Sequence, residues 1–385
     1  MVPVRRFCVL AFCFGLACGD SSAPTPPALV VADGDGQFAF VGGALPDPLV
    51  VQVTGSGGGP TSGATVQWTV TAGVATLAAA SSVTDGSGFA AMTVTVGDQP
   101  GPIAVRADAT GLPSVTFTAS ACALPVAFTF PDTISDSLAT TDCHAGGYYT
   151  DFFSLDLTSG QQGVTISMTS TVLDAWIDVY HGDGRLLGFH DDIVQGVNQN
   201  SLLEAIVAPG TYILAPRSFD QGTTGAYDVS VVARPQTLAN CDMVWVTRGV
   251  TVTDSLSSAD CVDPSGPYYA DFLSILLDAG SVLTVTERST AFDAYLSLYE
   301  WDGANGVFFA AENNDSAAQV TTDAHLVYTA PRRAPYLLFP STAPAGATGA
   351  YTLTIDASSA APAPVRLTPL RLPKVWPLPM RGRGR

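Results

Sequence analysis

Basic side chains are scarce through most of this 385-residue chain. Lysine and arginine total 16 against 34 aspartates and glutamates, and no acid follows Asp356. Between residues 7 and 356 there are eight basic and 34 acidic side chains, a formal charge of −26. Such a surface repels nucleic-acid phosphates and favours solubility. We therefore expect no nucleic-acid partner.

Long segments of helical period are also missing. Apolar residues make up 47% of the chain, but they form short runs between clusters of Gly, Pro and Asp. Alternation with a period of two, bounded by turn residues, is typical of β-strands. A chain of this length has room for roughly two to four domains. The pattern predicts an all-β fold of tandem β-sandwiches, one Ig-like and two jelly-roll-like repeats.

Catalytic motifs are absent from the sequence, which contains no GxSxG, HExxH or phosphate-loop pattern. A hydrolase needs a nucleophile beside a base, or a metal-bound water. His144, His181, His190 and His325 lie in separate segments, where we expect exposed loops. Paired carboxylates for glycoside cleavage stay open because Asp is abundant. We expect a protein that is not an enzyme.

The N-terminus has the pattern of a secretory signal over residues 1–18. Arg5 and Arg6 precede the apolar run FCVLAFCFGLA, which is too short to span a membrane, and no other long uncharged apolar run follows. The ending GLAC resembles a bacterial lipobox, although Gly15 stands where Leu is usual. That resemblance implies a lipid on Cys18 and a cell-envelope location, with the lipid as the only membrane contact. Ordinary cleavage, giving a periplasmic or secreted protein, is the alternative. Residues 19–27 suit a flexible linker.

Four cysteines remain once the signal is removed, an even number in an oxidising compartment. No CxxC occurs, and only His144 lies near a cysteine, which argues against a metal site. The spacings of 21 and 20 residues, once in each repeat, favour the pairs Cys122–Cys143 and Cys241–Cys261. Closing such a loop stabilises by about 3 kcal/mol in the chain-entropy model.

Residues 28–121 contain alternating strands separated by the turn clusters GSGGGPTSG and TDGSG. Trp68 is expected to fill the space between two sheets. The segments VGGALPDPLVVQVT, SGATVQWTV, VTDGSGFAAMTVTVG and GLPSVTFTASA resemble the group 1 bacterial Ig-like domain of invasin- and intimin-type proteins. The resemblance implies a stiff extracellular spacer or an adhesive module.

Residues 122–234 and 241–356 are two copies of one domain. DSLATTDC (136–143) matches DSLSSADC (254–261), YYTDFFSLDL (148–157) matches YYADFLSILL (268–277), and TGAYDVSVV (224–232) matches TGAYTLTID (348–356). A repeat this long indicates tandem globular domains. DFFSL, LDA, DD, PGTY and GAY in the first copy resemble the bacterial pre-peptidase C-terminal domain, a β-sandwich often appended to secreted peptidases. The second copy is the weaker match, because RAPY replaces PGTY, and no peptidase domain accompanies either copy.

The copies share an aromatic strand, DAWIDVY in the first and DAYLSLY in the second. Alternation places Ala175, Ile177 and Val179 in the core. The opposite face should meet water or an overlying loop. It is either a solvated face with cross-strand aromatic packing, or a face that stacks on sugars or extended peptides. The second interpretation makes these side chains the binding candidates: Trp176, Tyr180, Tyr295 and Tyr299.

Acidic loop residues beside this strand form a candidate calcium site. Calcium takes about six to eight oxygen ligands, often loop carboxylates. No EF-hand spacing is present, and Asp is common in turns, so solvated turns are the alternative. Calcium is the only cofactor that the sequence suggests, and none is required. The candidate ligands are Asp174, Asp191 and Asp192, with Asp220 as a further possibility in the first copy, and Asp293, Asn314 and Asp315 in the second.

The sequence as a whole favours an exported, non-enzymatic, monomeric envelope protein that adheres to, or binds, a carbohydrate or protein ligand. A purely structural, calcium-stabilised spacer is the alternative, followed by an accessory to a secreted hydrolase. Residues 357–385 are basic and Pro-rich, which predicts a disordered tail. That tail either docks on an anionic envelope surface or on the acidic body, or is a loose end.

Overall fold

The computed structural model describes residues 25–194, 196–238, 243–262, 268–301, 306–314 and 322–358. These residues form strands β1 to β32 and no helix, and none of their segments is a helix that could cross a membrane. The prediction of an all-β fold of tandem sandwiches is confirmed. The predictions for the signal peptide, Cys18, Cys241, Asp315 and residues 359–385 lie outside the described residues.

The first sandwich packs the sheet β1-β3-β7 against the sheet β2-β10-β9-β4-β6, with β5 and β8 as a small pair. Trp68 is 4% exposed, packs on Phe117 and donates its indole N–H to Ser82 Oγ at 2.9 Å. It therefore fills the core as predicted. The strands are β1 (Ala28–Asp33), β2 (Gln37–Phe40), β3 (Leu49–Thr54), β4 (Thr65–Ala72), β5 (Ala75–Leu77), β6 (Ser81–Val83), β7 (Phe89–Met92), β8 (Val94–Val96), β9 (Gly101–Ala109) and β10 (Val115–Cys122).

The first copy places the strands β11-β15-β20-β17-β18, with β14 and β13 beside β20, over the strands β12-β21-β16-β19. The repeated motifs supply the central strands, because their alternating apolar residues fill the space between the sheets. The strands are β11 (Val126–Phe128), β12 (Asp132–Leu138), β13 (Cys143–Ala145), β14 (Tyr148–Thr150), β15 (Phe153–Leu157), β16 (Gln162–Thr169), β17 (Ala175–His181), β18 (Leu186–His190), β19 (Ser201–Val207), β20 (Gly210–Ser218) and β21 (Gly225–Arg234).

The second copy repeats this arrangement, with β22-β26-β31-β28-β29 over β23-β32-β27-β30. Strand β22 pairs in parallel with β26 on one side and with β19 of the first copy on the other, so one 11-stranded sheet runs through both copies. The strands are β22 (Val244–Val246), β23 (Val250–Leu256), β24 (Cys261–Val262), β25 (Tyr269–Ala270), β26 (Leu273–Leu277), β27 (Val282–Arg288), β28 (Ala294–Trp301), β29 (Val307–Asn313), β30 (Ala324–Thr329), β31 (Ala334–Thr342) and β32 (Gly349–Ser358).

A disulfide joins the first sandwich to the first copy. Cys122 is bonded to Cys143, as predicted, but Cys122 is the last residue of β10 in the first sandwich while Cys143 begins β13. Phe38 of β2 stacks on Phe152 of the first copy at a centroid distance of 5.5 Å, next to the bond. The disulfide therefore clamps two modules together. Cys261 is also disulfide-bonded.

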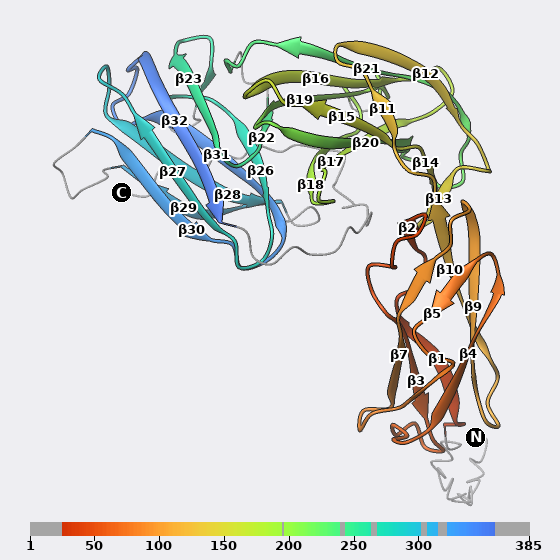
Figure 1. Cartoon of the computed structure of the whole chain (residues 1–385). Coiled ribbons are helices and arrows are strands. Elements are labelled where there is room, and N and C mark those ends of the chain that lie inside the picture. Colours follow the sequence, from red (N-terminus) through yellow and green to blue (C-terminus); the bar gives the residue numbers. More distant parts are fainter. Residues whose placement is uncertain are drawn as a thin grey trace, which may run out of the picture.

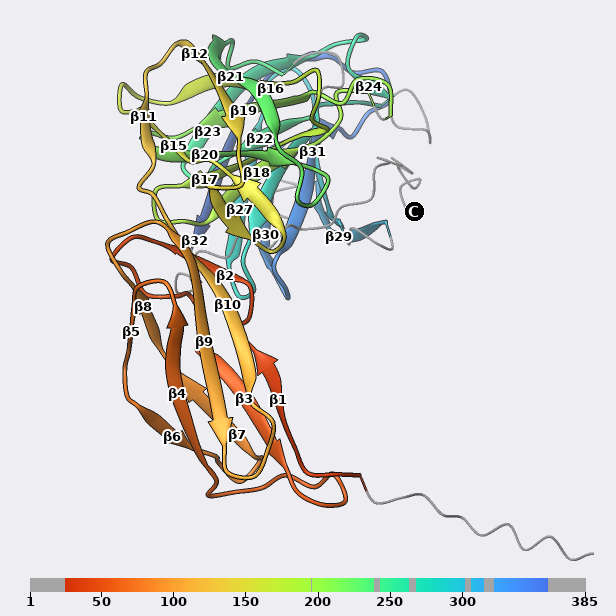
Figure 2. The same ribbon diagram turned by 90° about the vertical axis from the view of Figure 1, so that its right-hand side faces the viewer.

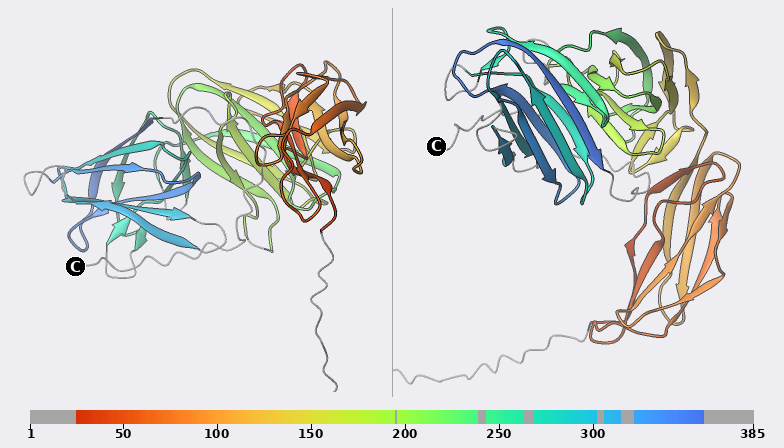
Figure 3. Two further views of the ribbon diagram at one scale, coloured as in Figure 1. Left: turned by 90° about the horizontal axis from the view of Figure 1, so that it is seen from below. Right: turned by 60° about the vertical axis from the view of Figure 1, so that its left-hand side comes forward.

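The three modules form a bent assembly. The first sandwich extends away from the two copies, which lie side by side (Figures 1 and 2). Both views in Figure 3 show the same arrangement, with the copies in contact along one side. The connection through β22 explains that contact, because one continuous sheet fixes how the two copies face each other.

Candidate functional site

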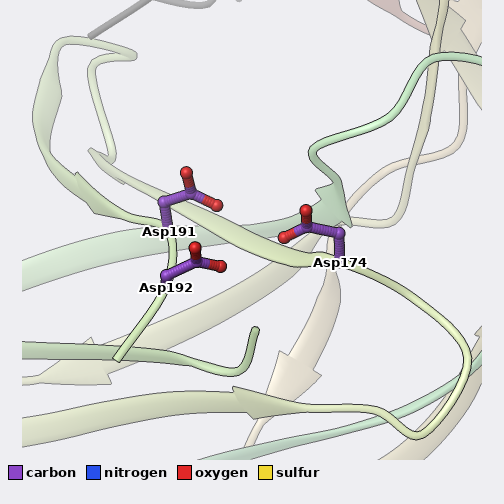
Figure 4. A group of neighbouring side chains, drawn as sticks. All are labelled: Asp174, Asp191 and Asp192. Carbon is purple, nitrogen blue, oxygen red and sulfur yellow. The ribbon is translucent and has the colours of Figure 1, made fainter. Parts of the chain in front are cut away.

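Three aspartates of the first copy come together at one end of a strand pair. Asp174 directly precedes β17, while Asp191 and Asp192 directly follow β18. Because β17 and β18 are antiparallel, with Ile177 opposite His190, the start of one lies beside the end of the other. One carboxylate oxygen from each aspartate lies within 4.8 Å of the other two, and the side chains face a common space (Figure 4).

Neighbouring groups hold these carboxylates in place. Gln199 Nε2 donates to Asp174 Oδ2 at 2.8 Å, and the Gly196 amide donates to Asp192 Oδ2 at 2.7 Å. Asp174 is only 9% exposed. The other carboxyl oxygen of Asp192, Oδ1, is buried and has no hydrogen-bond partner among the described residues. Three close carboxylates repel one another, and a hard cation that takes oxygen ligands relieves that repulsion. The donor set therefore fits calcium, and it does not include Asp220.

His190 fixes the end of β18 next to these carboxylates. Its Nδ1 accepts the backbone N–H of Leu202 at 3.0 Å, which ties β18 to β19. Burial lowers the pKa of His190, while the neighbouring backbone carbonyl of Asp191 and the charge of Asp192 oppose that shift. The imidazole is therefore neutral near pH 7 and contributes no charge to the site.

The second copy shows only part of the corresponding set. Asp293 precedes β28 as Asp174 precedes β17, and its carbonyl accepts from Ala343 as that of Asp174 accepts from Phe219, both at 2.7 Å. Asn314 is exposed, and Asp315 lies outside the described residues. Calcium binding by the second copy stays a prediction.

The aromatic face of the first copy, expected to meet water or an overlying loop, is buried and does not meet water. Trp176 is 3% exposed and Tyr180 is 4% exposed. Trp176 stacks on Phe189 with a centroid distance of 5.2 Å, and its indole N–H donates to Asp178 Oδ1 at 2.8 Å. Arg217 Nε donates to Asp178 Oδ2 at 2.9 Å, with the guanidinium 4.3 Å above the Trp176 ring.

Residues of the first copy and of the second copy both surround this face, since Trp176 also contacts Phe219 of its own copy. Trp245 and Trp301 pack against Phe189, with centroid distances of 5.5 and 6.4 Å. Both tryptophans belong to the same hydrophobic cluster as Trp176 and Tyr180. Strand alternation correctly separates two faces, but it does not tell whether another module covers the outer one. Trp176 is therefore unsuited to stacking on an external ligand.

The equivalent face of the second copy is half-buried. The Tyr295 hydroxyl donates to the Glu312 carboxylate, and Tyr299 meets Phe309 and Phe339 edge-on at 5.8 and 5.6 Å. Ser297 and Ser341 stand where the first copy has Asp178 and Arg217. A binding role for Tyr295 and Tyr299 stays a prediction.

Sequence reasoning missed one buried pair that recurs in both copies. The Tyr227 hydroxyl donates to Asp151 Oδ2 at 2.7 Å, and the Tyr351 hydroxyl donates to Asp271 Oδ2 at 2.5 Å. Burial raises the pKa of Asp151 and of Asp271 to about 7, although the tyrosine hydrogen bond opposes the shift in each case. The repetition of YYxDF and TGAY in both copies was the available signal.

The four histidines lie on strands β13, β17, β18 and β30, and the expectation of loop positions is wrong. Burial lowers the pKa of His181 to about 4. His325 Nδ1 lies 2.9 Å from the Thr286 hydroxyl, and the His144 ring lies 4.9 Å from the Tyr149 ring. Within the described ranges, Asp174, Asp191 and Asp192 are the only group of three or more His, Cys, Asp or Glu residues whose ligand atoms lie within 4.8 Å of one another.

A pocket lies between the first sandwich and the first copy, with a volume of about 410 Å³. We call it the inter-module pocket. Aromatic and aliphatic side chains form most of its wall, and its floor is the outer face of the sheet that contains β15, β17 and β20. Its lining includes Phe38, Phe40, Phe152, Tyr180, Gly182 and Ile213.

Comparison with known proteins gives limited similarity. No protein-family model matches the chain, and no curated protein matches it either. Among solved structures, the pre-peptidase C-terminal domain of a collagenase from Bacillus anthracis is 18% identical over 28% of this chain and 94% of that one, with a TM-score of 0.23. The D00–D0 domain of intimin is 26% identical over 24% of this chain and 46% of its own, with a TM-score of 0.18. InvD of Yersinia pseudotuberculosis is 13% identical over 86% and 97% of the two chains, with a TM-score of 0.20.

Proposed function

We propose that the protein is a non-enzymatic, exported spacer of the cell envelope, whose sandwich modules are fixed to one another and stabilised by calcium. The group formed by Asp174, Asp191 and Asp192 is the observation on which this proposal rests. The signal-like N-terminus and the acidic, lysine-free body agree with export. The resemblance of the modules to Ig-like and pre-peptidase C-terminal domains agrees with a spacer role.

Rigid junctions support a spacer. The Cys122–Cys143 bond and the Phe38–Phe152 stack hold the first sandwich against the first copy. A continuous sheet and two buried tryptophans hold the second copy. Small interfaces between domains usually permit relative motion, whereas a large apolar one suppresses it. Modules joined in this way keep a fixed distance and orientation relative to one another, as a spacer requires.

The proposed calcium site lies beside β18, the strand of the first copy that contacts the second copy. The ion would tie the start of β17 to the end of β18, and β18 is the strand that receives the second copy. A Cβ atom on Gly188 of β18 would lie only 2.5 Å from Trp245 Cδ2, so the fit there is close. Holding the β17–β18 pair in place therefore stabilises the contact between copies as well as the first copy.

Calcium titration of the full mature chain tests this proposal. We expect calcium to raise the melting midpoint of the first copy, by the equivalent of about 2.7 kcal/mol when calcium exceeds its Kd a hundredfold. Asp192→Asn should abolish the shift and the heat of binding in calorimetry. Asp108→Asn, at an exposed position of the first sandwich, is the matched control and should retain both. A wild-type protein whose midpoint ignores calcium and chelator would refute the calcium role.

Adhesion or ligand binding is the second candidate function. The half-buried rings of Tyr295 and Tyr299 favour it, because both keep part of their surface open. Glycan and matrix-protein arrays test it with Tyr295→Ala and Tyr299→Ala variants, and with Trp176→Phe as the buried control. Binding that both tyrosine variants retain would place the adhesive surface elsewhere.

Attachment to the envelope through Cys18 is part of the same proposal. A lipid on this residue anchors the chain, and the acidic body then stands away from the anionic membrane surface. Cys18→Ala should move the protein from the membrane fraction to the soluble one. A wild-type protein found only in the soluble fraction would contradict anchoring without affecting the calcium test.

A further inference from the structure

The junction between the two copies uses one side of each copy, and no other described module covers the opposite sides. The first copy contributes the β19 edge and the outer side of β18, and the second contributes the β22 edge with Trp245 and Trp301. In the first copy, β11 corresponds to β22, and the residue after β17 corresponds to Trp301 at the end of β28. In the second copy, β29 corresponds to β18 and β30 corresponds to β19. The pairing registers establish the equivalence, because Val126 lies opposite Phe153 as Val244 lies opposite Leu273.

Strand β11 has an edge that no described strand pairs with. It pairs in parallel with β15 on one side only, whereas β22 pairs on both sides. The Val126 amide donates to the Phe152 carbonyl at 2.9 Å, so the next amide, that of Ala127, points to the open edge. Val126 is 61% exposed, whereas its equivalent Val244 is fully buried. An open edge of this kind is a template for another strand.

Strands β29 and β30 present the complementary surface of the second copy. Strand β30 pairs only with β27 within the described ranges, whereas its equivalent β19 pairs with both β16 and β22. Phe308 and Phe309 on β29 are 47% and 56% exposed. Leu186, which stands on β18 where Phe309 stands on β29, is 6% exposed because the second copy covers it.

Side-chain size at the two uncovered surfaces differs from that at the equivalent positions of the internal junction, and it differs in opposite directions. Trp245 meets Gly188 within the chain. The registers place Ala127 at the position of Trp245, and Ala311 at that of Gly188. The β11 side therefore has a smaller side chain than the equivalent β22 side, and the β29 side has a larger one than the equivalent β18 side.

The inter-module pocket lies on the smaller surface. Gly182 takes the place of Trp301, and the apolar pocket of about 410 Å³ opens beside it. Two bulky exposed phenylalanines on one end therefore correspond to a hollow apolar surface on the other. Complementary size and apolar character are what a packed interface requires.

We propose that a second copy of this chain docks its β29–β30 side on the β11 edge and the inter-module pocket. Phe309, which shares the outer face with Tyr299, enters the pocket, and β30 pairs with β11 as β19 pairs with β22 inside the chain. Such a contact is heterologous, so it leaves one free end of each kind and repeats into an open-ended array unless it closes into a ring. The sequence led us to expect a monomer, and the two uncovered edges argue for association instead.

Sedimentation velocity of the full mature chain tests the proposal, up to about 0.1 mM, well above the micromolar Kd of the weakest interfaces of ordinary size. Wild-type protein should grow in mass with concentration. Phe308→Asp combined with Phe309→Asp blocks the β29 side. Gly182→Trp fills the pocket, and Ala127→Pro removes the edge amide without entering the pocket. Each blocked variant should be monomeric, while Val83→Asp, at an exposed valine of the first sandwich, should associate like the wild type.

Mixing the variants identifies the contact. A chain blocked on the β29 side keeps its pocket, and a chain blocked at the pocket keeps its β29 side, so an equimolar mixture should form dimers and nothing larger. Each variant is used only if its melting curve matches that of the wild type, and the two pocket-side variants check each other. A monomeric wild type, association that survives both kinds of block, or a mixture that stays monomeric would overturn the proposal.

Discussion

The buried Asp271–Tyr351 pair predicts that the second copy is more stable in mild acid than at slightly alkaline pH. Burial raises the pKa of Asp271 from its ordinary 3.8 to about 7. The folded state therefore binds the proton more tightly than the unfolded state does. The stabilisation is complete below about pH 4 and is lost as pH rises through 7. A shift of about three units corresponds to about 4 kcal/mol, and relaxation around the pair reduces that to about 2 to 4 kcal/mol.

Urea unfolding at pH 5 and at pH 8, with calcium held constant, measures this difference. Asp271→Asn keeps an oxygen acceptor for the Tyr351 hydroxyl but cannot ionise, so the loss of stability between the two pH values should shrink by about 2 kcal/mol or more. Asp356→Asn, at an exposed position, has the same charge change and should leave the loss unaltered. A wild type that is more stable at pH 8, or an Asp271→Asn variant with the full loss, would refute the reasoning.

Two further predictions concern buried charged side chains. Glu287 is fully buried where the first copy has the buried Met168, and burial raises the pKa of Glu287 well above its usual value. Glu287→Met should therefore stabilise the second copy by about 1 to 3 kcal/mol. A lower urea midpoint for this variant would contradict the prediction. Arg217→Ala leaves Asp178 buried without its cation and should cost the first copy about 3 to 5 kcal/mol, whereas Arg106→Ala at an exposed pair should cost less than about 1 kcal/mol. Equal losses for the two arginine variants in the same urea titration would contradict the argument from burial.

Local sequence patterns predicted most of the fold. Alternating segments gave the strands, the repeated motifs gave the two copies, and the spacing of Cys122 and Cys143 gave their bond. The grouping of Asp174 with Asp191 and Asp192 was also predictable, because all three flank two consecutive strands that form an antiparallel pair. These features depend on neighbours in the sequence or on the comparison of one copy with the other.

Contacts between modules could not be predicted in the same way. Nothing in DAWIDVY tells that Trp245 and Trp301, more than 60 residues further along the chain, close over the Trp176 cluster. The position of Cys122 in a strand of the first sandwich, rather than in the first copy, has the same origin. The Asp151–Tyr227 pair was different, since its motifs stood in both copies and only their proximity was hidden.

The two copies differ at two positions of the outer face, and the difference follows from how deeply that face is buried in each copy. In the first copy, Asp178 and Arg217 form a buried ion pair, and the Arg217 guanidinium lies over the rings of Tyr148 and Trp176. Each charge of such a buried pair depends on the other, because losing either partner leaves an uncompensated charge. In the first copy, Trp245 and Trp301 of the second copy join the hydrophobic cluster on this face. In the second copy serines stand at the same two positions, and the half-open face carries no charge that depends on a neighbour being present.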